Sequence, residues 1–146
     1  MNSAYFLRFV IMLSLIINAA GELYFYQLYR FGFQFDKFAH LANSLLFILA
    51  LASYGRTRYG LVPMKSLKIS VVIVIICGLG WEVGEFASDK FFQTKEFGIY
   101  GQLKAIDTIF DIIYDFLGIT LAAIMEKSFR FRLRSEVALC EGSPPA

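Results

Sequence analysis

Residues 106–126 read IDTIFDIIYDFLGITLAAIME, an apolar run in which an aspartate recurs at every fourth position, at Asp107, Asp111 and Asp115. At about 1.5 Å of rise per residue, a helix of this length is about as long as the ~30 Å hydrocarbon core of a bilayer. Residues four apart lie on one face of a helix. The stretch therefore predicts a membrane-spanning helix with an acidic stripe along one half.

Three further apolar runs precede this one, over about 6–28, 35–54 and 67–88. The chain has 146 residues, of which 58% are hydrophobic and 18% charged. A soluble domain this small has too much surface for such a composition. We therefore expect an all-α, four-helix transmembrane bundle as a single domain over 1–134, with the fourth helix over 106–126. The residues 135–146 are expected to form a disordered polar tail.

Charge distribution gives an expected orientation. The net charge of +2 is too small to indicate nucleic-acid binding, and we expect no nucleic-acid partner. With four crossings, nine of the 14 Lys and Arg residues fall on the side of the termini and the middle loop. Because cytoplasmic loops tend to hold the excess, both termini are predicted to be cytoplasmic, in the inner or plasma membrane.

Acidic residues from all four helices are predicted to meet in the outer leaflet. Seven of the 12 acids, together with the single histidine, fall toward the outer ends of the four predicted helices. They are Glu22, Asp36, Glu82, Glu85, Asp107, Asp111 and Asp115, with His40. Within each of the last three helices they are spaced three or four residues apart, so each set projects from one face.

Such a cluster requires a counter-charge. A carboxylate in the hydrocarbon region costs on the order of 3 kcal/mol, and several cannot all ionise together. The basic residues in the helices, mainly Lys37, are too few. A divalent metal, Mg²⁺, Mn²⁺, Ca²⁺ or Zn²⁺, would suit carboxylate oxygens and one imidazole. The predicted ligands are His40, Glu82, Glu85, Asp107 and Asp111, with Asp36 and Glu22 around them and Asp115 and Glu85 as catalytic carboxylates.

Three motifs in order resemble a known family. They are DKFAH at 36–40, WEVGE at 81–85 and DTIFDIIYDFLG at 107–118. This series is similar to that of the YjdF-like small integral membrane proteins, which are in turn similar to the VanZ-like family. The resemblance covers roughly 35–123 and implies a shared fold and a shared polar site.

The sequence leaves three functions open. The first is a metal-dependent membrane enzyme, a hydrolase or transferase acting on a lipid-linked or small polar substrate. The second is cation or proton translocation through the acidic cluster, because intramembrane acids often mark ion pathways. The third is a non-catalytic protein that binds a lipid or another ligand. Membrane lipid is the expected partner in each case, and self-association into a homo-oligomer stays open.

Overall fold

A computed structural model describes residues 3–21, 35–92 and 104–141, and in this part of the chain every element is a helix. The helices are α1 (Ser3–Ala20), α2 (Phe35–Tyr59), α3 (Pro63–Phe92) and α4 (Lys104–Glu141). Each contains a stretch long and apolar enough to cross a membrane. The predicted all-α architecture with four candidate spans is therefore confirmed.

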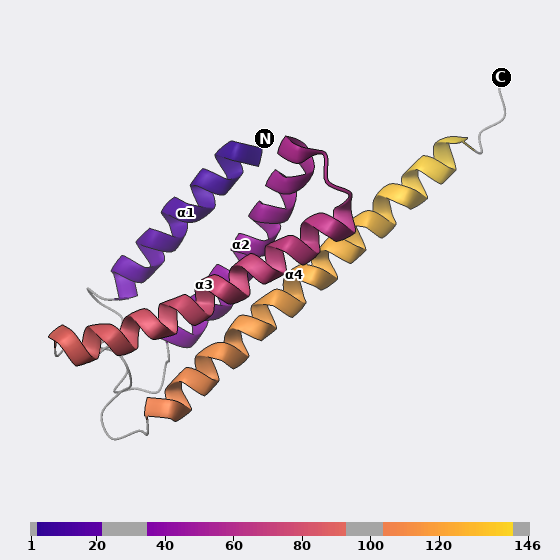
Figure 1. Ribbon diagram of the computed structural model, residues 1–146. Helices are drawn as coiled ribbons and strands as arrows, with labels where there is room; N and C mark the ends of the chain where they lie inside the picture. Colours follow the sequence, from indigo (N-terminus) through magenta and orange to yellow (C-terminus); the bar gives the residue numbers. More distant parts are fainter. Residues whose placement is uncertain (1–2, 22–34, 93–103, 142–146) are drawn as a thin grey trace.

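Helix α2 is the centre of the arrangement (Figure 1). It packs against α1, α3 and α4, and α3 also packs against α4. Ion pairs join the start of α2 to the start of α4 and the end of α2 to the middle of α4, so these two helices run parallel. Helices α2 and α3 are joined by a short turn and run antiparallel. The first halves of α2 and α4 therefore lie at the same end as the second half of α3.

The apolar side chains divide between a small core and a large outer surface. The core contains Ile48 of α2, Leu67 and Val74 of α3, and Ile119 and Ala122 of α4. Many large apolar side chains instead face outward on all four helices, which is expected where lipid rather than water surrounds a bundle. The outward-facing set includes Phe9, Leu15, Phe38, Ile76, Val83, Ile109 and Phe116.

The turn between α2 and α3 is shorter than the sequence predicted. The expected helix ends at residues 54 and 67 are wrong, since α2 continues to Tyr59 and α3 begins at Pro63. Gly60 ends α2 with a φ of 62°, which glycine adopts without steric cost. Pro63 suits the first turn of a helix because its missing N–H would have no partner there. Basic residues that the sequence assigned to a loop therefore lie in helices.

Helix α4 also extends beyond its predicted end. It continues past residue 126 to Glu141, so the expected disordered tail is helical from residue 135 to residue 141, and Figure 1 shows this end of α4 reaching beyond the other helices. The physical reason is composition: the segment 127–141 contains no glycine or proline. At the other end of the chain, the predicted continuation of the first helix to residue 28 lies outside the described residues.

Gly118 brings α2 and α4 close together. A Cβ atom at this position would lie 2.5 Å from the carbonyl oxygen of Leu41 and 3.0 Å from the backbone nitrogen of Leu45. Only a residue without a side chain allows two helix backbones to approach this closely. The contact lies one turn from both His40 and Asp115, and it therefore holds the two halves of the polar cluster against each other.

Candidate metal centre

The candidate site is built from the first halves of α2 and α4 and from the second half of α3. Helix α2 contributes Asp36 and His40, which are one turn apart and share a face. Helix α4 contributes Asp111 and Asp115 with the same spacing, and α3 contributes Glu82. Acids from all four helices were predicted to meet, and the contacts of His40 bring together Asp36, Glu82, Asp111 and Asp115 from the last three.

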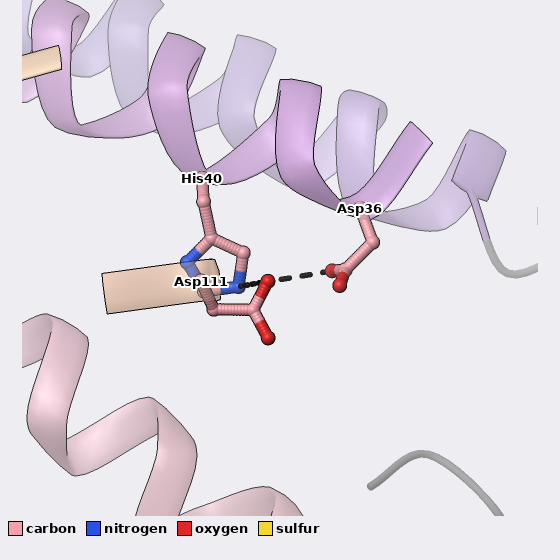
Figure 2. Close-up of side chains that lie close together, drawn as sticks. All are labelled: Asp36, His40 and Asp111. Carbon is pink, nitrogen blue, oxygen red and sulfur yellow. Dashed lines mark ion pairs between the residues drawn. The ribbon is translucent and has the colours of Figure 1, made fainter. Parts of the chain in front are cut away.

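The imidazole of His40 lies among four carboxylates. Its Nε2 atom is 3.7 Å from Asp36 Oδ1, 3.8 Å from Glu82 Oε1 and 3.8 Å from Asp111 Oδ1. Its Nδ1 atom is 3.3 Å from Asp115 Oδ1. Ligand atoms of Asp36, His40 and Asp111 all lie within 4.8 Å of one another, and Figure 2 shows these three side chains directed toward a common point.

Lys37 is part of the same cluster. Its side chain is only 3% exposed, and its ammonium group donates to Asp111 and, at 3.1 Å, to Asp36 Oδ2. The sequence correctly identified Lys37 as the main basic residue near the acids, and its buried position makes it a direct counter-charge. With four carboxylates, one ammonium group and one imidazole, fully ionised acids would still leave an excess of at least two negative charges.

Asp115 is held on the far side of the imidazole. The hydroxyl of Ser44 donates to Asp115 Oδ1 at 2.5 Å, the same oxygen that faces His40 Nδ1. Metal-binding histidines usually donate the N–H of the other ring nitrogen to a carboxylate, which fixes the tautomer and the ring orientation. Asp115 lies beside His40 Nδ1 in the same way. Its geometry therefore fits a residue that orients the imidazole, while His40 Nε2 would bind the metal.

Both carboxylate oxygens of Glu82 are buried. Its side chain is 8% exposed, and within the described part of the chain neither carboxylate oxygen has a partner at full hydrogen-bond geometry, although the Thr108 side chain interacts with it. The side-chain oxygen of Asn43 on α2 is also buried without such a partner. Buried acceptors normally find a donor, an ordered water or a cation. Glu82 Oε1 lies 3.8 Å from His40 Nε2, so the carboxylate is directed into the cluster.

In the described part of the chain, Glu85 is not joined to this group, and the structure does not describe the side chains of two other predicted site residues, Asp107 and Glu22. Glu85 lies one turn beyond Glu82 and accepts a hydrogen bond of 2.5 Å from the indole of Trp81. It is not among the residues whose ligand atoms lie within 4.8 Å of one another in the described regions. Asp107 is in the first turn of α4, and its side chain lies outside what the structure describes. Glu22 also lies outside the described residues.

Sequence reasoning missed Ser44, which donates to Asp115, and Asn43, which has a buried side-chain oxygen on the same helix. Ser44 is one turn after His40, on the same face of α2, and this spacing was the available signal. Asn43 is three residues after His40, which is also compatible with that face. Both were overlooked because serine and asparagine are ordinary helix-contact residues in membranes.

The donor set of the cluster is suited to a divalent cation. Carboxylate oxygens are the preferred ligands of Mg²⁺, Ca²⁺ and Mn²⁺, and a neutral imidazole extends the range to Zn²⁺. Asp36, His40 and Asp111 could each supply one ligand atom, and Glu82 could supply a fourth. A divalent ion would also reduce the excess negative charge of the four carboxylates.

Comparisons with known proteins identify a family but no characterised relative. No curated protein and no solved structure matches the chain. A family model described as "Predicted membrane protein (DUF2238)" matches residues 3–132. This match includes the candidate spans and every residue of the polar cluster. The chain therefore belongs to the DUF2238 family of predicted membrane proteins.

Proposed function

We propose that this membrane protein binds one divalent cation through Asp36, His40, Asp111 and Glu82, and that the cation is required for its activity. The observation that carries the proposal is the buried carboxylate of Glu82, directed at a histidine that two further carboxylates approach. Buried acceptors with excess negative charge are stabilised by a cation rather than by another acceptor.

The proposed activity is hydrolysis or group transfer on a lipid-linked or small polar substrate at the membrane surface. A divalent ion at this site could polarise a substrate oxygen or activate a water molecule. Asp36 is the most exposed carboxylate of the cluster and lies in the first turn of α2, so substrate would approach from this end of the bundle. Glu85, one turn from Glu82, is the remaining carboxylate for proton transfer.

Metal analysis of the detergent-purified protein tests the cation. We expect about one equivalent of Mn²⁺, Mg²⁺, Ca²⁺ or Zn²⁺ per chain after equilibration and desalting, and a loss of most of it in Asp111→Asn. Glu126→Gln is the matched control, because Glu126 is an equally buried acid whose partner is Arg56 instead of the cluster. The proposal is wrong if the unaltered protein holds no stoichiometric metal, or if Asp111→Asn holds as much as the control.

Translocation of cations or protons has less support. A pathway needs polar stations on both sides of the membrane. Between the cluster and the Arg56–Glu126 pair, the described parts of α2 and α4 carry no Asp, Glu, His, Lys or Arg, and the apolar core fills the interval. Metal-dependent ion flux in liposomes would favour translocation. Metal binding without turnover on any lipid fraction would favour the non-catalytic binding function.

The orientation and the narrower family assignment are also proposals. The Lys and Arg distribution supports a plasma-membrane location with both termini in the cytoplasm. Reporter fusions after residues 61 and 141 should both report the cytoplasm. The three motifs support a YjdF-like identity with VanZ-like relatives, and they include six residues of the cluster (Asp36, Lys37, His40, Glu82, Asp111 and Asp115).

A further inference from the structure

Lys37 binds the same two carboxylates that the proposed cation requires. Its ammonium group donates to Asp111 and to Asp36 Oδ2, while the opposite oxygen of Asp36 faces His40 Nε2. The Asp111 oxygen that accepts from Lys37 is also the oxygen 3.8 Å from His40 Nε2. One acceptor therefore faces both the ammonium group and the imidazole.

A divalent ion and the Lys37 ammonium group would repel each other strongly here. An ion coordinated by Asp36, His40 and Asp111 would have to lie within a triangle whose ligand atoms are at most 4.8 Å apart. An ammonium group hydrogen-bonded to two of the same carboxylates would then be within a few ångströms of the ion. Charges of the same sign at such a distance inside a bundle are scarcely screened. Simultaneous occupation is therefore unfavourable.

Lys37 has a short route out of the cluster. It is the third residue of α2, so its backbone lies at the end of the helix where the polar membrane surface is expected. A lysine near a helix end can keep its aliphatic stem against apolar residues and extend its ammonium group to the interface. Neighbouring Asp36 is 22% exposed, so the cluster is least enclosed beside Lys37.

We propose that Lys37 is a built-in competitor of the metal: its ammonium group occupies Asp36 and Asp111 when no divalent cation is bound, and it leaves when one binds. This inference rests on the proposed metal site. The competition lowers the affinity of the site, so that the cation is held exchangeably, and it provides the carboxylates with a counter-charge in the metal-free protein.

Mn²⁺ titration of purified Lys37→Met tests the competition. Removing the ammonium group should tighten Mn²⁺ binding at least tenfold, because the ion no longer has to displace it. Lys37→Arg keeps the charge and should bind Mn²⁺ more weakly than Lys37→Met. Lys68→Met, which removes an exposed charge near the start of α3, should retain the affinity of the unaltered protein.

The outcomes separate the two proposals. If the unaltered protein binds Mn²⁺ and Lys37→Met binds it with equal or lower affinity, the competition is wrong and the metal site stands. If neither binds Mn²⁺, Mg²⁺, Ca²⁺ or Zn²⁺, the metal site itself is wrong. A second measurement needs no variant: mass spectrometry after treatment with an amine-reactive reagent should show Lys37 modified faster with Mn²⁺ than without it. Equal modification rates would overturn the competition even if Lys37→Met fails to fold.

Discussion

His40 Nδ1 lies 3.3 Å from Asp115 Oδ1, whereas the three carboxylates of Asp36, Glu82 and Asp111 approach the other ring nitrogen. The two nitrogens therefore have different environments. If Nδ1 carries the proton and donates it to Asp115, the lone pair of Nε2 is directed at the remaining carboxylates and is available to a metal. Asp115 thus fits a residue that positions His40 rather than a ligand.

Asp115→Asn should weaken Mn²⁺ binding by roughly 10–100-fold, the usual effect of losing the carboxylate behind a metal-binding histidine. The loss should be smaller than in Asp111→Asn, which removes a ligand. Isothermal titration of the purified protein measures both. Ser44→Ala should have a milder effect in the same direction, because it removes only the hydroxyl that holds Asp115. Undiminished affinity in Asp115→Asn would contradict this role.

Gly78→Ala should disturb the site while leaving the fold largely unaffected. A Cβ atom at Gly78 would lie 2.7 Å from Asp115 Oδ2, and the end of an aspartate side chain can move away at little cost. The displaced carboxylate would hold His40 less well, so we expect roughly tenfold weaker Mn²⁺ binding. The melting temperature should change little. Gly84→Ala is the matched control, since a Cβ there would meet nothing within 4 Å.

Gly118→Ala should lower stability instead. Its Cβ would press on the backbone of α2 at Leu41 and Leu45, which cannot move without separating the two helices. Overpacking of this kind costs about 1–3 kcal/mol, partly offset by the better helix propensity of alanine. We expect a net loss of about 1 kcal/mol in the free energy of unfolding in detergent. Gly84→Ala, measured in parallel, should be neutral or slightly stabilising.

Much of the helical architecture could be predicted from the sequence because length and hydropathy determine membrane spans almost directly. The number of crossings predicted that Asp36, Glu82 and Asp111 lie at the same end of the bundle. Helical periodicity predicted that each of them shares a face of its own helix with a second polar residue. Helix ends were less predictable. Charged residues such as Arg56 and Lys65 were read as loop markers, yet long basic side chains are tolerated at the ends of membrane helices.

Pairwise partners could not be predicted, because they depend on how the helices are rotated about their axes. Periodicity indicated that Asp111 and Asp115 share a face, but it did not indicate that Asp111 faces Lys37 while Asp115 faces Ser44. The burial of Lys37 was missed for the same reason. Glu126 gives a further example, since its partner comes from a helix turn that was expected to be a loop.

The ion pair between Arg56 and Glu126 is expected to be the main polar contribution to stability at the other end of the bundle. The guanidinium group donates to both oxygens of Glu126, at 2.7 and 3.1 Å, and the carboxylate is buried. Arg56→Met would remove the guanidinium group that donates to both oxygens of this buried carboxylate. Because the Arg56 side chain is 27% exposed, breaking the pair should cost less than breaking a fully buried one, on the order of 1–2 kcal/mol. The free energy of unfolding in detergent should fall accordingly, while Mn²⁺ binding by the distant cluster should persist.

A double variant distinguishes loss of the pair from general damage to α2. Arg56→Met combined with Glu126→Leu removes both charges, and it should recover most of the lost stability because the buried carboxylate is replaced by an apolar side chain. Arg58→Met is the matched control, since Arg58 is exposed two residues further along the same helix, and it should change the free energy of unfolding by less than about 0.5 kcal/mol. If Arg58→Met were as destabilising as Arg56→Met, charge at the end of α2 would matter more than the pair. If the double variant recovers the free energy of unfolding and Arg58→Met does not lower it, the stabilisation comes from the contact between α2 and α4.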